Sequence, residues 1–138
     1  MEPIAIYTDD FRLSFRLVGE LKRRGVIFEI LDFKRDPNPS GIWLGSAVEV
    51  ANAIGKGRGI GVSIETVHLS VERAIHLARG LDSAVFLTFG IDPGPRPGIA
   101  WLADGVLVGT AQLEIVDDVV DHILAIASLF EYDRLRVK

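Results

Sequence analysis

The sequence has 138 residues and a mass of 15.1 kDa, which fits one domain or two very small ones. Hydrophobic residues make up 49% and charged residues 25%, with a mean hydropathy of +0.31, so the composition is globular and excludes intrinsic disorder. The formal net charge of −4 is uneven, because residues 1–80 carry 11 Lys and Arg against 10 Asp and Glu, whereas residues 81–138 carry 4 against 9. A basic footprint over the whole chain is excluded, and a contact with nucleic acid requires a local patch.

The residue types also bear on the compartment. The chain has no cysteine, which excludes a disulfide scaffold, a cysteine-ligated zinc site and a thiol nucleophile. The first ten residues lack the basic and apolar regions of a signal peptide, and no apolar run approaches the ~18 residues of a membrane helix. We therefore expect a cytoplasmic protein that makes no contact with a membrane.

The chain begins with the pattern of a parallel β-α-β unit. A short apolar strand at Ile4–Tyr7 leads through the capping residues Thr8–Asp10 into the first helix. This helix is expected over Phe11–Arg24, with Gly25 in position to end it. Val26–Phe33 then predicts a buried strand, which completes the unit.

The elements expected up to residue 80 complete a small Rossmann- or flavodoxin-like unit. In chain order they are a polar loop at Lys34–Ser40, a short strand at Gly41–Leu44, a short helix at Ser46–Ile54, a glycine-rich loop at Gly55–Gly61, a strand at Val62–Val67 and a helix at Val71–Arg79 that Ser70 caps and Gly80 closes. Asp9, Asp10 and Asp32 resemble the acidic pocket of response-regulator receiver domains. The receiver pattern also needs a lysine near the end of a fifth strand, and none is evident in this sequence. Helix capping is therefore the favoured role of Asp9 and Asp10.

Two basic features of this unit have two interpretations each. Lys56 and Arg58 lie in the glycine-rich loop, which is either a plain loop or a contact for an anion or nucleic acid, and which does not match the phosphate-binding P-loop pattern. Arg12, Arg16 and Arg23 share one face of the first helix, which is either a solvated surface or a stripe that binds phosphates.

The second half predicts the order β-β-β-α-β over residues 81–138. The expected elements are a strand at Ala84–Ile91, a turn region at Asp92–Gly98, hairpin segments at Ile99–Leu102 and Val106–Val108 around Asp104-Gly105, a third antiparallel strand from Gly109–Ile115, a helix at Asp118–Phe130 capped by Asp117, and a final strand from Glu131. The fold class is therefore α/β, with units at 1–80 and 81–138.

One segment carries a family resemblance. Phe89–Gly105 reads FGIDPGPRPGIAWLADG, in which an apolar strand delivers Asp92 at its end and a Pro-Gly turn leads into a hairpin. It resembles the first strand and hairpin of the RNase H-like superfamily, in particular RuvC-type Holliday-junction resolvases and related archaeal proteins. The likeness covers about 55 residues from Ala84 onward and only the N-terminal part of the family's core.

The resemblance implies metal-dependent phosphodiester chemistry. Asp92 would be a catalytic residue and a ligand of Mg²⁺, and two such ions would hold the attacking water and the leaving oxygen. Gly94 and Arg96 would approach a phosphate of DNA or RNA. The family supplies a second acid from the strand after the first helix, where this sequence has Arg134, Arg136 and Lys138. We therefore expect a RuvC-like protein that binds nucleic acid and is either part of a longer chain or catalytically inactive.

Two alternatives stand beside this interpretation. The acids Glu114, Asp117, Asp118 and Asp121 could substitute as metal ligands, although the last three are favoured as residues of a helix N-terminus. The other alternative is a non-enzymatic interaction or small-ligand-binding module that uses residues 1–80. A likeness of the strand and hairpin to actin-like ATPases is disfavoured, because those proteins need two copies of the fold.

Overall fold

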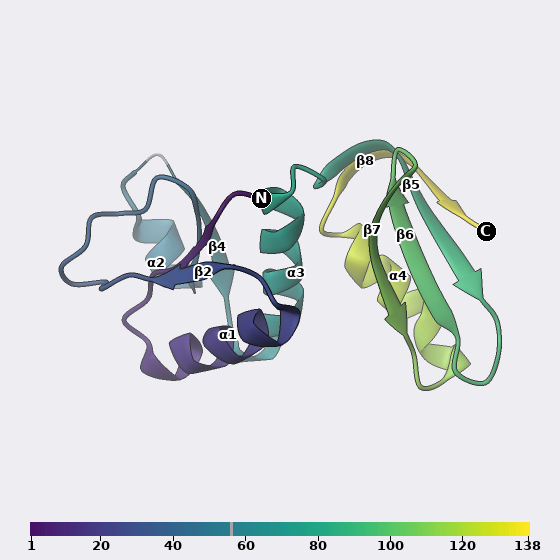
Figure 1. The fold of residues 1–138 in the computed structure, drawn as a ribbon, viewed down its shortest axis with the longest axis horizontal. Coiled ribbons are helices and arrows are strands. Elements are labelled where there is room, and N and C mark those ends of the chain that lie inside the picture. The colour runs from purple at the N-terminus through teal and green to yellow at the C-terminus, as the bar shows by residue number, and fades with distance from the viewer. Residues whose placement is uncertain (56) are drawn as a thin grey trace. The chain divides into compact units, whose positions relative to one another are not determined.

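The structure is a computed structural model that describes residues 1–55 and 57–138. The chain divides into two compact units, Met1–Arg79 and Gly80–Lys138, each with a four-stranded sheet of its own (Figure 1). The parallel sheet and its helices make this an α/β protein, as the sequence predicts. Among the helices of the described ranges, none has the length and apolar character needed to cross a membrane.

The first unit is a parallel sheet covered by helices. Its elements are β1 (Ile4–Ile6), α1 (Phe11–Arg24), β2 (Phe28–Ile30), β3 (Ile42–Ser46), α2 (Ala47–Asn52), β4 (Arg58–Val62), a 3₁₀ turn (Ile64–Thr66) and α3 (Val67–Ala78). The strand order is β2-β1-β3-β4, and every neighbouring pair is parallel. The chain leaves β1 toward β2 on one side and continues to β3 on the other, so the order reverses between β1 and β3.

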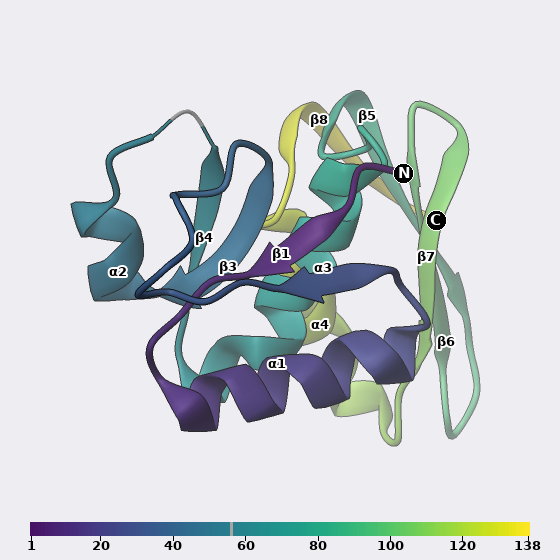
Figure 2. The ribbon, with the colours of Figure 1, turned by 60° about the vertical axis from the view of Figure 1, so that its left-hand side comes forward.

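The core of this unit lies between the sheet and helices α1 and α3. Ile6 and Leu44 of the sheet pack in one apolar cluster with Leu17 of α1 and with Ile75 of α3, all of them nearly inaccessible to solvent. Figure 2 shows α1 and α3 beside the strands, and α2 next to β4. The opposite side of the sheet carries a smaller cluster around Trp43.

The ends of α1 confirm the local prediction. The Asp10 side chain accepts a hydrogen bond from the backbone N–H of Leu13 at 3.1 Å, which caps the first turn. Gly25 ends the helix with φ 67°, a conformation that glycine adopts at little cost.

Two predicted elements of the first sheet are wrong. β2 is a three-residue edge strand with half-exposed and exposed residues, not a buried strand over Val26–Phe33. The glycine-rich segment is not a loop from residue 58 on, because β4 begins at Arg58 and ends at Val62. The Trp43 ring lies directly on Gly59, where a Cβ would stand 2.7 Å from the ring, so the glycine serves close packing within the sheet.

The start of α3 also differs from the prediction. The helix begins at Val67, after a turn in which the Ser63 N–H donates to the Thr66 hydroxyl at 3.0 Å. Ser70 is therefore buried inside the helix and does not cap it. The predicted strand over Val62–Val67 is replaced by this turn.

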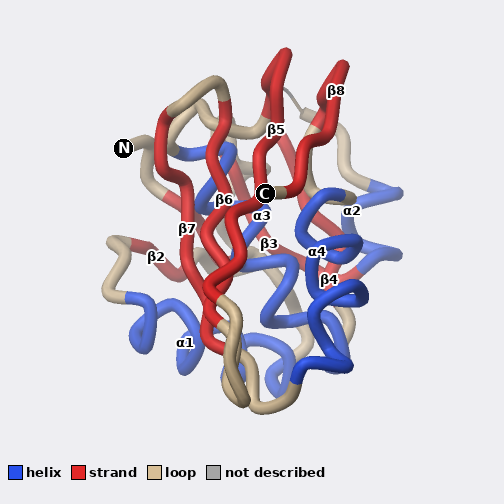
Figure 3. The backbone as a smooth tube through the Cα atoms, turned by 90° about the vertical axis from the view of Figure 1, so that its right-hand side faces the viewer, coloured by secondary structure: helices blue, strands red, loops and turns tan. Residues whose placement is uncertain are grey.

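The second unit is a mixed sheet crossed by one helix. Its elements are β5 (Ser83–Asp92), β6 (Gly98–Ala103), β7 (Val106–Gln112), a 3₁₀ turn (Val116–Asp118), α4 (Val119–Ala127) and β8 (Glu131–Val137). The strand order is β7-β6-β5-β8, with β5, β6 and β7 antiparallel and β8 parallel to β5. Figure 3 shows these strands in red with α4 in blue.

One face of this second sheet forms the core with α4. Leu87, Phe89 and Trp101 are buried on it, and the Trp101 ring lies 6.2 Å from the His122 ring of α4. Gly109 pairs with Trp101, and a Cβ there would stand 2.4 Å from the indole. This contact explains why a glycine occupies the middle of β7.

The hairpin and the helix start test two further predictions. Asp104 and Gly105 have φ 49° and 83°, as expected for an Asp-Gly hairpin turn. β7 continues directly from this turn to Gln112, so Val106–Val108 and Gly109–Ile115 are not separate strands. Asp117 lies within the 3₁₀ turn and does not cap α4, which begins at Val119 without a side-chain cap.

Candidate functional site

Asp92, the predicted metal ligand, is the last residue of β5. It pairs with Gly98 of β6, and its side chain is exposed to solvent. Across residues 1–55 and 57–138 its carboxylate takes part in no ion pair. The sequence therefore places this carboxylate correctly at the end of a central strand.

The donor set around Asp92 does not fit a two-metal centre. A pair of Mg²⁺ ions needs several hard oxygen ligands, and nowhere in the described part of the chain do three or more acidic or histidine side chains gather for a metal. The neighbouring strand β8 brings cations instead, because Arg136 pairs with Thr88. Lys138, directly after the end of β8, also lies beside β5, because its backbone N–H donates to the Phe89 carbonyl at 2.8 Å.

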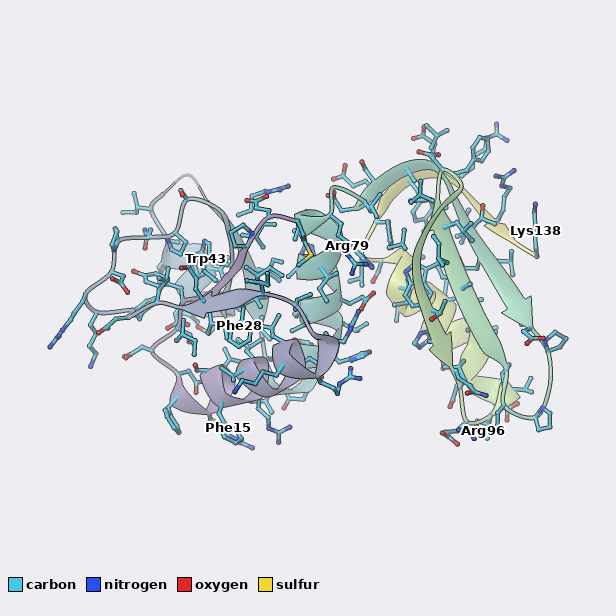
Figure 4. The ribbon with its side chains drawn as sticks, in the orientation of Figure 1. Phe15, Phe28, Trp43, Arg79, Arg96 and Lys138 are labelled. Carbon is cyan, nitrogen blue, oxygen red and sulfur yellow. The ribbon has the colours of Figure 1, made fainter. Side chains whose placement is uncertain are left out.

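The predicted phosphate contacts are divided between the two units. Gly94 and Arg96 lie in the exposed loop between β5 and β6, and Arg96 is labelled in Figure 4. The Arg96 Nη2 lies 3.0 Å from Glu114 Oε1, so an acid offsets its charge. Arg58 belongs to the other unit, where its Nη2 lies 3.8 Å from Glu2 Oε2. The remaining predicted contact, Lys56, lies outside the described residues.

A basic surface that the sequence prediction missed lies on β8. Successive residues of a strand point to opposite faces, so Arg134, Arg136 and Lys138 share one face. The acids Glu131 and Asp133 occupy alternate positions and belong to the other face. The alternation in EYDRLRVK was the signal that could have revealed this separation of charge.

These cations belong to the face of the second sheet opposite its core, which we call the open face. By alternation and register its members are Ala84, Phe86, Thr88, Gly90 and Asp92 of β5, Gly98, Ala100 and Leu102 of β6, Leu107, Thr110 and Gln112 of β7, and Tyr132, Arg134, Arg136 and Lys138 at β8. Each of them is half-buried or exposed. The face therefore has small side chains at Thr88, Gly90 and Ala100, apolar side chains at Leu102 and Leu107, and cations along the edge formed by β8.

The charges on the open face are poorly balanced. The guanidinium carbon of Arg136 lies 4.2 Å from the centre of the Phe86 ring, in a cation–π contact that leaves its charge in place. Arg134, Arg136 and Lys138 form no ion pair with any described residue. Asp92 is the sole acid among the residues that define this face. The second unit is acidic overall, yet all its unpaired cations are on this one surface.

In the first unit, the point where strand order reverses is filled by a side chain of the protein itself. Ligands of open α/β sheets bind beyond the carboxyl ends of the strands at such a point. Here Glu49 of α2 receives hydrogen bonds from the Thr8 hydroxyl at 2.5 Å, the Asp9 N–H at 2.8 Å and the Ser46 N–H at 2.9 Å. The site therefore already holds an anion.

The pKa of Glu49 reflects these contacts. Burial raises the pKa of the carboxyl, but the hydrogen bonds from Thr8, Asp9 and Ser46 outweigh burial and bring it below the ordinary value. The ionised carboxylate thus uses the donors that an anionic ligand would need. This arrangement gives no support to a small-ligand site at the reversal point.

The receiver-like acids do not form a common pocket. Asp10 caps α1, and Asp32 accepts a hydrogen bond from the Lys34 N–H at 2.9 Å in the turn after β2. Asp9 lies 3.9 Å from the Lys34 ammonium. Receiver domains carry carboxylates at the ends of the first and third strands. Here the third strand, β3, ends at Ser46, which caps α2, so no acid stands at that position.

Comparison of the chain with protein-family models, with curated proteins and with solved structures finds no match. The open face of the second sheet is the surface whose chemistry indicates a function. That face combines unpaired cations and one carboxylate with both small and apolar side chains.

Proposed function

We propose that the protein is a RuvC-like, RNase H-fold protein that binds nucleic acid through the open face of its second sheet. The observation that carries the proposal is the row of three unpaired cations, Arg134, Arg136 and Lys138, in a unit whose other basic residue is already paired with Glu114. Contacts to phosphates supply most of the affinity in such complexes.

The spacing of the cations suits a chain of phosphates. Residues two apart in a strand are separated by roughly 6.6 Å, since each residue advances about 3.3 Å. The guanidinium groups thus lie in a row along the edge of the sheet. The neighbouring positions Thr88, Gly90 and Ala100 carry small side chains, and Phe86, which pairs with Arg134, adds an aromatic ring beside the cations.

The arrangement of the unit supports the proposed kinship. A three-stranded antiparallel sheet is followed by a helix and by a strand parallel to β5, which is the order implied by the resemblance. The carboxylate of Asp92 stands at the end of β5, where the resemblance implies a metal ligand. Because the donors around it do not fit a two-metal centre, we propose binding by this chain and no cleavage step.

The test is binding of labelled oligonucleotides, measured by fluorescence anisotropy. Single-stranded DNA, single-stranded RNA and duplexes of one sequence are titrated with the wild type and with the double variant Arg134→Ala/Arg136→Ala. A matched control, Lys34→Ala/Arg35→Ala, removes two exposed cations from a loop of the first unit. We expect only the first variant to weaken binding.

The salt dependence sharpens this test. Each lost phosphate contact reduces the slope of log K against log salt by about 0.7 for single strands and about 0.9 for duplex DNA. The slope measured for the Arg134→Ala/Arg136→Ala variant should therefore be smaller in magnitude by about 1.4 to 1.8 than that of the wild type. The slope of the control variant should equal that of the wild type. No binding by the wild type at low salt, or an equal loss in both variants, would contradict the proposal.

Cleavage is tested separately. The wild type is incubated with Mg²⁺ and with branched, hybrid or single-stranded substrates, alongside Asp92→Asn. We expect no cleavage by either protein. Robust Mg²⁺-dependent cleavage that Asp92→Asn abolishes would overturn the claim that this chain only binds.

A further inference from the structure

Helix α1 presents two aromatic side chains to solvent. Phe11 is 84% exposed and Phe15 is 71% exposed. They are four residues apart and so lie one above the other on the helix surface. Figure 4 shows Phe15 on the side of α1 that faces away from the sheet. Exposed aromatic residues of this size that form a contiguous patch are uncommon on a free surface and mark interaction sites.

The surroundings of this aromatic pair are basic. Arg12 and Arg16 follow Phe11 and Phe15 with the same spacing of four, and Lys22 lies on the same exposed side two turns further on. Arg12 and Arg16 form no ion pair within the described ranges. We call Phe11, Arg12, Phe15 and Arg16 the basic stripe.

Glu20, an acid on the same helix as the basic stripe, is already engaged. Glu20 lies at the edge of α1, where its Oε1 is 2.5 Å from an Arg23 nitrogen and 3.1 Å from His68 Nδ1. These contacts hold the pKa of the Glu20 carboxyl below its ordinary value, and the hydrogen bond from Arg23 has the largest effect. The basic stripe therefore keeps its positive charge and calls for an acidic partner with an apolar surface.

Helix α4 carries a surface of that chemistry. Val120 is 65% exposed and Leu124 is 58% exposed, and they are also four residues apart. Asp121 of α4 and Asp117 of the preceding 3₁₀ turn accompany them, both exposed, and neither forms an ion pair with a described residue. We call Asp117, Val120, Asp121 and Leu124 the acidic stripe.

We propose that the basic stripe of one copy of the chain docks on the acidic stripe of a second copy. Both stripes carry a pair of exposed apolar side chains one helical turn apart, accompanied by two like charges: Arg12 and Arg16 on α1, and Asp121 on α4 with Asp117 in the turn before it. The apolar pairs can pack as helices do at an interaxial distance of 8–10 Å, while the opposite charges select the partner and the register. The contact joins two different surfaces of the chain, so each copy can take part in it through either stripe.

A second copy is favoured over a nucleic acid as the occupant of the basic stripe. Phosphates would contact the two arginines but would leave the apolar pair of α4 uncovered. A second copy covers both exposed patches with a single type of contact. Binding of nucleic acid at α1 by a monomeric protein would overturn the proposal.

The test uses charge reversal and sedimentation velocity over a wide range of protein concentrations. We expect the wild type to self-associate, and both Arg12→Glu/Arg16→Glu and Asp117→Arg/Asp121→Arg to sediment as monomers. The control Lys34→Glu/Arg35→Glu has the same charge change as the first variant and should associate like the wild type. Circular dichroism verifies that each variant is folded.

The decisive step is to mix the two reversed variants. Each stripe of one variant then meets an oppositely charged stripe of the other, so the mixture should form a heterodimer although each variant alone is monomeric. A wild type that stays monomeric at every concentration, reversed variants that still associate, or a mixture that stays monomeric would each refute the contact.

Discussion

The buried carboxylate of Glu72 gives a stability prediction that can be worked out from the structure. Glu72 lies in α3 and is 5% exposed. Its Oε1 is 2.9 Å from His76 Nε2, and its Oε2 forms an ion pair with Arg24 of α1. Burial alone raises the pKa of this carboxyl, but the hydrogen bonds and charges of His76 and Arg24 outweigh burial and lower it to about 2.

The pKa sets the size and the pH range of the effect. A carboxyl whose pKa falls from 4.5 to about 2 on folding stabilises the protein at neutral pH by about 3 kcal/mol, since one pKa unit corresponds to about 1.4 kcal/mol. Solvent screening of the quarter-exposed Arg24 side chain reduces this to about 2 kcal/mol. Because the pKa is depressed in the folded state, this stabilisation is present above pH 4.5 and is lost as the pH falls toward 2.

The prediction is that Glu72→Gln lowers the free energy of unfolding by about 2 kcal/mol at pH 7, and that the difference from the wild type shrinks toward pH 2. Each unit contains one tryptophan, so in a Trp101→Phe background the fluorescence of Trp43 reports urea unfolding of the first unit. The exposed Glu65 provides the control Glu65→Gln. Equal stability of Glu72→Gln and the wild type at pH 7, or a difference that grows on acidification, would refute the reasoning.

Three further outcomes are expected. Gly109→Ala should destabilise the second unit by about 1–3 kcal/mol in urea unfolding followed by Trp101 fluorescence, because the new Cβ overlaps the indole; an unchanged midpoint would contradict this packing. Asp104→Ala should lower the midpoint of thermal unfolding, because the Asp104 carboxylate accepts hydrogen bonds from the N–H groups of Val85 and Phe86, each worth about 1 kcal/mol. A midpoint equal to that of the wild type would show that these two hydrogen bonds contribute nothing. Arg96→Ala should leave oligonucleotide affinity nearly unchanged in anisotropy titrations, because an acid already offsets its charge; a loss as large as that of the Arg134/Arg136 variant would reverse the assignment.

The elements that the sequence predicts well are those set by neighbouring residues. The bounds of α1 follow from a capping aspartate at one end and Gly25 at the other, both local features. The long apolar run of β5 and the Asp-Gly turn of the hairpin are equally local, and both are present as expected. Such features act through the backbone of a few adjacent residues and do not depend on the rest of the fold.

The incorrect predictions concern elements whose structure depends on contacts with residues outside the local segment. The glycines of β4 resemble a loop in the sequence, but Gly59 leaves room for the Trp43 ring of a neighbouring strand and Gly61 lies against Ala47 of α2. The start of α3 depends on the side-chain contact between Ser63 and Thr66, which competes with the expected cap at Ser70. In both cases packing or a side-chain contact overrides the apparent propensity.

The candidate site also has features that the local sequence predicts and features that depend on distant residues. The position of Asp92 at the end of β5 follows from the apolar run before it, so the sequence predicts it. The pairing of Arg96 with Glu114 joins residues 18 apart across the sheet, and no local pattern reveals it. The cations of β8 were visible as an alternation, but their meaning required the register that places them beside β5.

The most direct test of the central claim is a two-dimensional NMR titration of the ¹⁵N-labelled protein with the oligonucleotide that binds best in the anisotropy series. Binding at the open face predicts that the amide signals of Tyr132–Lys138 and Phe86–Asp92 shift most, while those of α2 and the reversal point at Glu49 stay in place. Shifts confined to the first unit, or shifts on α4 without any on β8, would contradict the account.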